Sequence, residues 1–264
     1  MPEPTVPVPA NLPSDFPAWS LAATWEEDTI GESSCDVYRI TAPDGTTAYA
    51  KIGPAGHLAA DRVILDWLLD KPLPVPQLLY SNTASERDFM LMTAIEGEHA
   101  ASDSNLAAPE RTVVLYAEAL RRIHAMPAAD CPIDRRLDAV LSEAADRIRF
   151  GLVDLDDFEP ANHGRSPEEL LAELRDTRPE REELVFTHGD YCMPNLMLWD
   201  GAISGIIDWG SGGIADRYQD VALAVRSLRH NKLADYVPLF LRTYGIEDPD
   251  LARIRYYILL DEFF

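Results

Sequence analysis

The spacing of apolar and polar residues divides the chain into a strand-rich first third and a helix-rich remainder. Residues 37–40 and 47–50 are strand-like segments on either side of a Pro-Asp-Gly turn, and residues 89–93 form a further apolar strand. Between them, residues 57–69 carry leucines at helical spacing, and a proline-rich segment ends that helix. The change of pattern near residue 96 predicts two lobes.

The second part of the chain carries helix signals. Apolar residues repeat at helical spacing between Pro109 and Pro127. Ser166, Pro167 and Glu169 have the spacing of a capping box with proline in the first turn. The other expected elements are a strand at 184–187, a hairpin over 196–207 and a last helix from Asp248 almost to Phe264.

These elements predict an α+β fold with two lobes. Residues 1–96 are expected to form an antiparallel-sheet lobe, and residues 97–264 a larger helical lobe. The residues before Phe16 are rich in proline and small side chains, so we expect a flexible lead-in there that forms no packed element.

The charge of the chain narrows the choice of ligand. Its 264 residues include 23 Lys+Arg against 45 Asp+Glu, a formal net charge of −22 at pH 7. A nucleic-acid partner is not expected, because phosphate binding needs a basic surface. An acidic cleft would instead concentrate a cationic ligand. The alternative is that the acidity only keeps the protein soluble.

The cysteines and the apolar runs indicate the compartment. The three cysteines, Cys35, Cys131 and Cys192, are an odd number without CxxC spacing, which argues against a disulfide framework or a zinc site. The N-terminal segment lacks the features of a signal peptide, and no apolar stretch is long enough to cross a bilayer. We therefore expect a cytoplasmic protein with no membrane partner.

The strongest chemical signal is the segment 188–195, with the sequence HGDYCMPN, followed by Asp208 after an apolar strand. Carboxylate and amide oxygens suit magnesium, which takes one or two carboxylates and fills its other positions with water and phosphates. Asp208 would bind the metal with Asn195 beside it, and Asp190 would orient an attacking hydroxyl and accept its proton. Each residue alone could simply cap a turn or end a strand.

Lys51 is the second chemical signal, because it ends the strand-like segment Tyr49-Ala50-Lys51-Ile52. A lysine there that faces inward could pair with nucleotide phosphates. Asp61 shares the apolar face of the following helix with Leu58 and Leu65. A carboxylate on a buried face is costly unless it is paired, and Lys51 could supply the pair. The alternative is a surface lysine and an incidental aspartate.

Four motifs together resemble the aminoglycoside 3′-phosphotransferases, the kanamycin kinases. They are the HGDxxxxN segment, the later IIDWG, the AYAK lysine and the terminal LLDEFF. Choline, homoserine and fructosamine kinases share text similar to HGDxxxxN, whereas its combination with the DEFF terminus is much more specific. The resemblance extends from about Trp19 over nearly the whole chain, and it implies a protein-kinase-like fold with ATP between the lobes.

The resemblance implies a role for each matching residue. Asp190 matches the catalytic aspartate, and Asn195 and Asp208 match the magnesium ligands. The residues that match the ATP site are Lys51 for the α- and β-phosphates with its partner Asp61, Tyr49 for stacking on adenine, Thr93 to Ile95 for the hinge, and Ser33 and Ser34 for the loop over the phosphates. The matches to acceptors of substrate ammonium groups are Asp157, Glu159, Asp261, Glu262 and the carboxylate of Phe264.

The chain also departs from the family at several positions. Asp61 stands where relatives usually have glutamate, and Ser211 where they often have arginine. His230 and Pro160 stand where some relatives place acids that touch the drug. These departures leave the range of antibiotics open.

Three functions stay open at this point. The first is an ATP- and magnesium-dependent aminoglycoside 3′-phosphotransferase that confers resistance, with kanamycin or neomycin as substrate. The second is a kinase of another small amine or alcohol, such as choline. The third is a non-catalytic nucleotide-binding protein, against which the joint presence of Lys51, Asp190, Asn195 and Asp208 argues. We expect a monomer or a weak homodimer.

Overall fold

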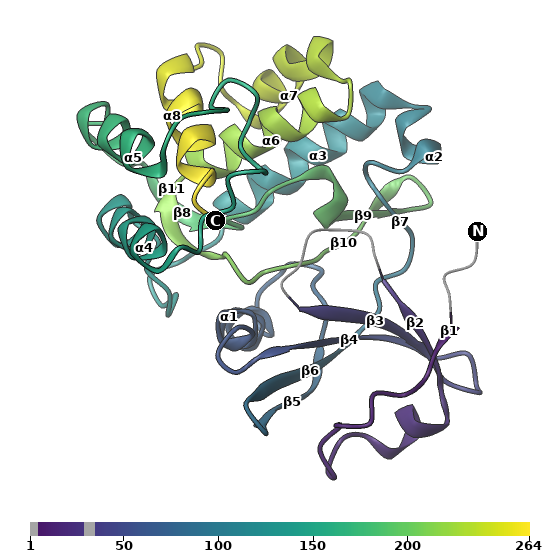
Figure 1. Ribbon diagram of the computed structural model, residues 1–264. Helices are drawn as coiled ribbons and strands as arrows, with labels where there is room; N and C mark the ends of the chain where they lie inside the picture. Colours follow the sequence, from purple (N-terminus) through teal and green to yellow (C-terminus); the bar gives the residue numbers. More distant parts are fainter. Residues whose placement is uncertain (1–4, 29–34) are drawn as a thin grey trace. The chain divides into compact units, whose positions relative to one another are not determined.

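The computed structural model describes residues 5–28 and 35–264 (Figure 1). The chain forms two compact units. The first comprises Met1–Gly97 and Ser204–Gly210, and the second comprises Glu98–Ile203 and Ser211–Phe264. The segment Ser204–Gly210 therefore belongs to the first unit although more than a hundred residues of the second precede it, which the sequence pattern did not indicate.

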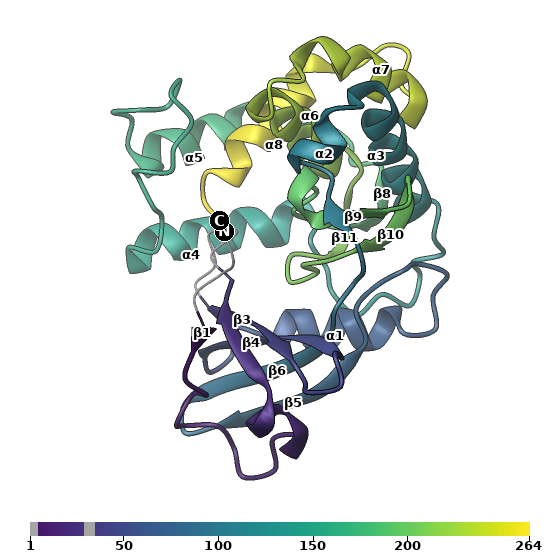
Figure 2. The ribbon, with the colours of Figure 1, turned by 90° about the vertical axis from the view of Figure 1, so that its right-hand side faces the viewer.

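The first unit is built on a six-stranded antiparallel sheet with the order β1-β2-β3-β4-β6-β5 (Figure 2). Its strands are β1 (Thr5–Val6), β2 (Thr24–Glu27), β3 (Asp36–Thr41), β4 (Thr47–Pro54), β5 (Leu78–Ala84) and β6 (Arg87–Thr93). The strands β4 and β6 are central. The strand β6 pairs with β4 on one side and β5 on the other, and it is buried over most of its length.

Residues 5–15 pack against this sheet, which differs from the prediction that the segment before Phe16 forms no packed element. The strand β1 pairs with β2, and the side chain of Phe16 is buried in the core with Trp25. Val6, Val8 and Leu12 lie against the same core. Apolar residues between the prolines thus cover the sheet, and a short helical turn, η1 (Ala18–Ala22), connects them to β2.

Helix α1 (Ala59–Leu68) follows β4 and buries Ile64, Leu65 and Leu68. The chain ahead of it is held by Asp88, whose Oδ2 accepts hydrogen bonds from the N–H groups of Gly56 (2.8 Å) and Leu58 (3.0 Å). Burial alone would raise the pKa of Asp88, but these bonds and one from Thr83 lower it. The ionised carboxylate therefore fixes the entry to α1.

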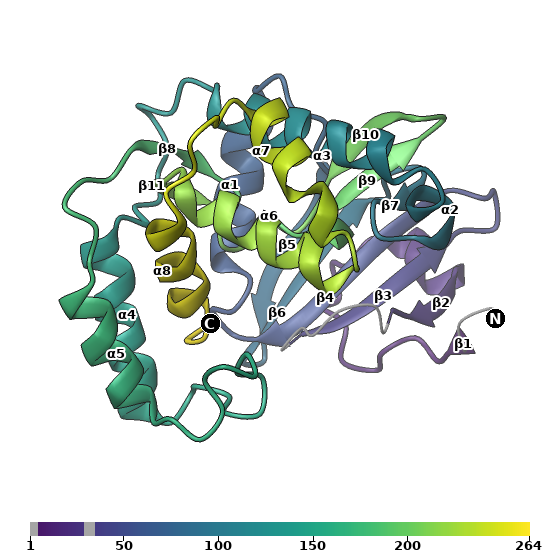
Figure 3. The same cartoon turned by 90° about the horizontal axis from the view of Figure 1, so that it is seen from above.

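The second unit is mainly helical, and α3, α6 and α7 lie side by side in it (Figure 3). The helices are α2 (Asp103–Leu106), α3 (Pro109–His124), α4 (Leu137–Phe150), α5 (Pro167–Asp176), α6 (Tyr218–His230), α7 (Val237–Tyr244) and α8 (Leu251–Asp261), with a short turn η3 (Ala234–Tyr236). The predicted helix from Pro109 is confirmed, and its apolar stripe, which includes Val113 and Leu120, is fully buried.

Short strands precede and follow the candidate catalytic segment along the chain. The strand β8 (Leu184–Thr187) pairs with β11 (Gly213–Asp216), and a further sheet has the order β10-β9-β7. Its strands are β7 (Glu98–His99), β9 (Leu196–Trp199) and β10 (Ala202–Ile206). The turn with His188 to Asp190 lies between β8 and the short helix η2 (Met193–Asn195), and both ends of the turn are therefore held by hydrogen-bonded elements.

The helix ends agree with the sequence signals in one case and differ in another. The predicted capping box is present, since Ser166 Oγ accepts from the Glu169 N–H and Glu169 Oε2 accepts from the Ser166 N–H. The last helix begins at Leu251 and not at Asp248, because Asp250 caps it through the N–H groups of Ala252 and Arg253. Within the part of the chain that the structure describes, no helix combines the length and apolarity needed to span a bilayer.

Candidate active site

The turn that carries Asp190 is held by buried hydrogen bonds to α6. Asp220, which is fully buried, accepts from the N–H of His188 through Oδ2 (2.7 Å) and from the N–H of Gly189 through Oδ1 (2.8 Å). The buried ring of His188 in turn accepts the Asp190 N–H at Nδ1 (3.3 Å). His188 therefore holds the turn and leaves the carboxylate of Asp190 partly exposed.

Asn195 lies against Asp190, which precedes it by five residues. Its Nδ2 donates to the backbone oxygen of Asp190 (2.9 Å) and to Oδ2 of the carboxylate (3.0 Å). Beneath them, Tyr116 and Tyr191 stack with ring centroids 4.6 Å apart, and each hydroxyl donates to the backbone oxygen of the other. This reciprocal pair anchors the segment after Asp190 to α3.

Gly189 is required by the turn for two reasons. Its φ is +84°, and a Cβ at this position would lie 2.0 Å from the backbone oxygen of Ser211. Gly151 has a φ of +66° and nothing within 4 Å of a Cβ. We expect Gly151→Ala to destabilise the protein by about 1 kcal/mol through backbone strain alone. Gly189→Ala should cost more than about 3 kcal/mol because backbone atoms must also move.

Denaturant unfolding of the two variants tests this expectation. Both glycines lie in the second unit, so the comparison separates the left-handed backbone from the steric clash. Equal losses of unfolding free energy would show that the turn can move away from Ser211, contrary to the close approach seen here.

The first unit brings Lys51, Asp61 and Asp208 together. Lys51 Nζ lies 3.3 Å from Asp61 Oδ1 and 2.8 Å from Asp208 Oδ1. Burial alone would lower the pKa of Lys51, but the charges of Asp208 and Asp61 together raise it. Burial raises the pKa of Asp61 despite its pairing with Lys51. The predicted pairing with the buried aspartate is thus present, although Lys51 lies inside β4 and not at its end.

Asp208 presents its carboxylate from an unusual backbone conformation. Its φ is +65°, and its side chain is 47% exposed although it pairs with the nearly buried Lys51. The following Gly210 allows a close approach to α1, since a Cβ there would lie 2.4 Å from Asp61 Oδ2. The half-exposed carboxylate of Asp208 and the amide oxygen of Asn195 are hard oxygen donors of the kind that magnesium prefers.

The donor set excludes a metal centre made by the protein alone in the described ranges. Within residues 5–28 and 35–264, no cluster of three or more His, Cys, Asp or Glu side chains could hold a metal. A half-exposed carboxylate such as that of Asp208 suits a cation that takes most of its ligands from phosphates and water. By this criterion, Asp208 fits magnesium bound together with a nucleotide.

Two of the other residues predicted for the nucleotide, Tyr49 and Thr93, lie in the same sheet. Tyr49 is half-buried in β4, and Thr93 ends β6, where its N–H and Oγ1 bond to the backbone of Gln77. Ile95 follows in the connection after β6, and its side chain packs against Gly205. Ser33 and Ser34 lie outside the described residues. Their roles, and those of Tyr49, Thr93 and Ile95, stay predictions.

The acidic C-terminal residues are held in a network with the loop before α5. Asp261 pairs with Arg226 of α6 at 2.5 Å. Glu262 accepts from Asn162 Nδ2 at 2.5 Å and from the N–H of Glu159. Glu159 pairs with His230 at 3.0 Å. Three of the predicted acids thus have partners, and these contacts join α6, the end of α8 and one loop, whereas Asp157 lies exposed in that loop.

The chain end is packed rather than free. Phe263 is fully buried, and its backbone oxygen accepts a hydrogen bond from Arg147 of α4. The ring of Phe264 is half-exposed beneath the guanidinium groups of Arg147 and Arg135, at 5.6 and 5.9 Å from its centroid. These contacts hold Phe263 and Phe264 against α4.

Arg226 is the chief charged residue that sequence reasoning missed. Its guanidinium balances Asp261 and lies within the fields of Asp190 and Glu159, whose charges help to raise its pKa against the effect of burial. Arg226 and His230 stand four residues apart on α6, and hence on one face. That spacing was visible in the sequence, but their acidic partners lie in remote segments.

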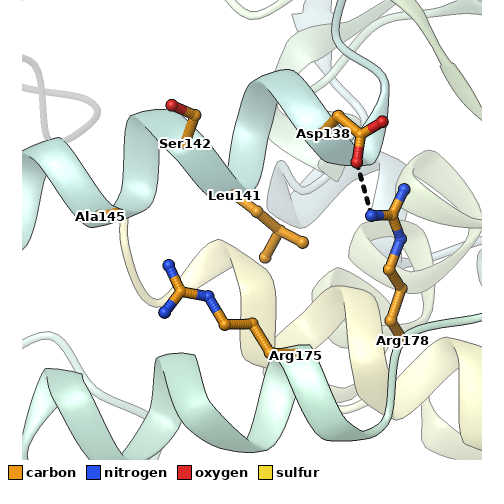
Figure 4. A pocket seen from close by; sticks show the side chains of 6 residues that line it. All are labelled: Asp138, Leu141, Ser142, Ala145, Arg175 and Arg178. Carbon is orange, nitrogen blue, oxygen red and sulfur yellow. Dashed lines mark hydrogen bonds and ion pairs between the residues drawn. The ribbon is translucent and has the colours of Figure 1, made fainter.

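A pocket between α4 and α5, about 400 Å³ in volume, lies apart from these residues (Figure 4). Arg175 and Arg178 line it, and Arg178 donates to Asp138 at 2.5 Å. Two guanidinium groups disfavour a cationic ligand. The pocket therefore does not match the substrate that the acidic residues indicate.

Known proteins resemble this chain along most of its length. The profile of the phosphotransferase enzyme family matches residues 26–257. An aminoglycoside 3′-phosphotransferase of Niallia circulans is 41% identical over 89% of this chain and 90% of that protein. Another from Streptomyces fradiae is 37% identical over 91% of this chain and 95% of that protein.

Solved structures have the same fold. The crystal structure of an aminoglycoside 3′-phosphotransferase of type VIII superposes with a TM-score of 0.85 at 32% identity, covering 92% of this chain and 94% of that one. An aminoglycoside phosphotransferase of Streptomyces rimosus, APH(3'')-Id, in complex with ADP and streptomycin, has a TM-score of 0.76 at 31% identity. It covers 90% of this chain and 92% of its own. The predicted α+β, protein-kinase-like fold is confirmed.

Proposed function

The chain belongs to the phosphotransferase enzyme family, and on that basis we propose that it transfers the γ-phosphate of ATP to the 3′ hydroxyl of an aminoglycoside antibiotic, which confers resistance. The strongest support comes from Asp190, a partly exposed carboxylate on a rigid turn with Asn195 at 3.0 Å. A carboxylate that is fixed in place and reachable by solvent suits a base for a sugar hydroxyl.

The proposed reaction is a single displacement at the γ-phosphorus of ATP. The acceptor oxygen forms a bond to the γ-phosphorus, the bond from that phosphorus to the β,γ-bridging oxygen breaks, and ADP leaves. Asp190 accepts the proton of the hydroxyl. Its Oδ2 takes a hydrogen bond from Asn195, so the carboxylate is oriented before the substrate arrives. Positioning and electrostatic stabilisation supply the rate enhancement in this class of reaction.

The nucleotide would be held by Lys51 and by magnesium at Asp208 and Asn195. Lys51 keeps its charge because Asp208 and Asp61 raise its pKa, so it can bind the α- and β-phosphates. Bound magnesium would neutralise the charge of the phosphate oxygens. Tyr49 would stack on adenine, the backbone from Thr93 to Ile95 would bind its edge, and Ser33 and Ser34 would cover the phosphates. The use of ATP agrees with the ADP bound to the Streptomyces rimosus relative.

The C-terminal acids would bind the ammonium groups of the antibiotic. The candidates are Asp157, Glu159, Asp261, Glu262 and the carboxylate of Phe264. Charge-assisted hydrogen bonds from several ammonium groups give affinity with modest demands on shape. Asp261 is paired with Arg226, and Glu159 with His230, so a substrate ammonium would share or replace these contacts. His230 adds a basic group to this wall, and we expect it to narrow the range of antibiotics.

Acidification is expected to weaken the affinity for the cationic substrate. Burial raises the pKa of Asp261 to about 6; Arg226 lowers it, and the charge of Asp190 raises it. Above that pH the carboxyl is an anion, and below it the carboxyl is neutral and a poorer acceptor for ammonium. We expect KM for kanamycin to rise roughly tenfold from pH 7.5 to 5. This change corresponds to the loss of about 1.4 kcal/mol of binding free energy from one charge-assisted hydrogen bond.

Steady-state kinetics over this pH range test the role of Asp261. The substrate's amines become only more fully protonated on acidification, so they cannot explain a loss of affinity. The KM for ATP serves as an internal control, and Asp261→Asn should flatten the profile for kanamycin. An equally steep profile in that variant would assign the effect to another group.

Coupled ATP turnover by the purified protein with magnesium tests the proposed function. The acceptors to compare are kanamycin, neomycin, choline and none. We expect turnover that requires an aminoglycoside. Turnover with choline alone would indicate a kinase of another small amine or alcohol. Nucleotide binding without turnover by any acceptor would favour a non-catalytic nucleotide-binding protein.

A further inference from the structure

We propose that Arg217, Tyr244 and His124 form a directional hydrogen-bond relay that positions Asp220, and through it the turn that carries Asp190. All of these residues lie in the second unit. The inference rests on the proposed function only in taking Asp190 as the catalytic residue. The other members act through Asp220 and are positioning residues.

The relay ends on the carboxylate that holds the turn. Besides the two backbone N–H groups, Asp220 accepts a hydrogen bond from His124 Nε2 at 2.9 Å. This bond falls on Oδ2, the oxygen that also accepts the N–H of His188. A rotation of the Asp220 carboxylate would therefore break bonds on both sides, and His124 opposes such a rotation.

The other ring nitrogen of His124 continues the relay to the start of α6. Its Nδ1 lies 2.6 Å from the hydroxyl of Tyr244, at the end of α7, and that hydroxyl accepts a hydrogen bond from Arg217 Nε at 2.9 Å. His124 is the last residue of α3. The relay thus ties α3, α6 and α7 to the turn after β8 (Figure 3).

The two ends of the relay have fixed roles as donor and acceptor. Arginine only donates and a carboxylate only accepts. The Tyr244 oxygen accepts from Arg217, and we assign its own proton to the hydrogen bond with His124 Nδ1. That nitrogen is then an acceptor, and the ring proton lies on Nε2, from which it is donated to Asp220. In this arrangement each hydrogen bond of the relay has one donor and one acceptor.

Burial and ring contacts make this arrangement rigid. The side chains of His124 and Asp220 are 5% and 0% exposed, and a hydrogen bond in such surroundings is costly to break. Burial raises the pKa of Tyr244 to about 12, although Arg217 lowers it, and the phenol therefore keeps the proton that it donates. The guanidinium of Arg217 also lies 4.7 Å from the centroid of the Tyr244 ring.

The tautomer of His124 gives a test that is independent of catalysis. Long-range proton–nitrogen NMR of the protein labelled with nitrogen-15 distinguishes the two ring nitrogens at neutral pH. We expect a protonated Nε2 and an unprotonated Nδ1 for the ring that is lost in His124→Gln. Two protonated nitrogens, or a proton on Nδ1 alone, would overturn the relay even if the enzyme phosphorylates aminoglycosides.

Kinetics of a matched pair of variants test its effect on turnover. Tyr244→Phe removes the central hydroxyl, and we expect kcat to fall about 5-fold, as for one net hydrogen bond. KM for ATP and for kanamycin should change less than about twofold, because no relay member contacts substrate in the proposed site. Tyr256→Phe is the control: Tyr256 is also 4% exposed, and its hydroxyl has no hydrogen-bond partner among the described residues.

Two substitutions of His124 test the last bond. His124→Ala should lower kcat roughly 100-fold through displacement of the turn. His124→Gln can still donate to Asp220 and should recover about tenfold of that loss. Equal kcat for Tyr244→Phe and Tyr256→Phe, or equal losses for both His124 variants, would overturn the positioning role. If His124→Ala does not fold, the comparison of Tyr244→Phe with Tyr256→Phe still tests the positioning role.

Discussion

Asp190→Asn is expected to abolish most of the phosphoryl transfer while leaving the protein folded. The amide cannot accept the proton of the substrate hydroxyl, and general-base catalysis contributes roughly 10²- to 10⁴-fold. The turn should persist because Asp220 and His188 bond to backbone N–H groups and not to the Asp190 side chain. Single-turnover measurements with saturating ATP and kanamycin would report the loss directly.

Asp200→Asn provides the control for that variant. Asp200 is exposed in the turn between β9 and β10 with a φ of +47°, a conformation that asparagine adopts readily. The same loss of one charge on the same unit should leave kcat within about twofold, as for surface substitutions. If Asp190→Asn retained turnover close to that of this control, Asp190 would not be the base.

Asp208→Asn is expected to have the second-largest effect. The substitution removes the half-exposed carboxylate that fits magnesium, and Lys51 loses its closer partner at 2.8 Å. We expect kcat to fall by roughly 10²- to 10³-fold, the range for loss of one electrostatic stabiliser. Asparagine tolerates the φ of +65° at this position, so the fold should be kept.

Asp61→Asn distinguishes the two roles of Asp208. It also removes a carboxylate from Lys51, at 3.3 Å, but leaves the carboxylate of Asp208 for the metal. We expect a smaller loss of about tenfold, the effect of one charged hydrogen bond. Nucleotide affinity should depend on magnesium concentration in Asp61→Asn and much less in Asp208→Asn. The same dependence in both would argue against Asp208 as a metal ligand.

The elements that the sequence predicted are those with a clear period or a local signal. Helix α3 has one apolar stripe between prolines, and α5 begins at a capping box. In contrast, α6 is buried on several sides and holds buried polar residues, so no apolar stripe stands out. Buried and exposed residues alternate only weakly along the edge strand β5, so this strand was not predicted either.

The site divides in the same way. Asp190 and Asn195 lie five residues apart, and the face of α1 that holds Asp61 was visible from its leucines, so local patterns identified them. The partners that tune these groups come from remote parts of the chain. His124 is 96 residues from Asp220. No local pattern specifies such a pair, because only the packing of the helices brings its members together.

The structure of the reaction product tests the central claim most directly. The purified protein would be incubated with ATP, magnesium and either kanamycin B or its 3′-deoxy form, tobramycin, and the products examined by phosphorus and proton NMR. We predict one phosphate on the 3′ oxygen of kanamycin B and no product from tobramycin. Phosphorylation of tobramycin, or a phosphate at another hydroxyl of kanamycin B, would contradict the proposed 3′ transfer.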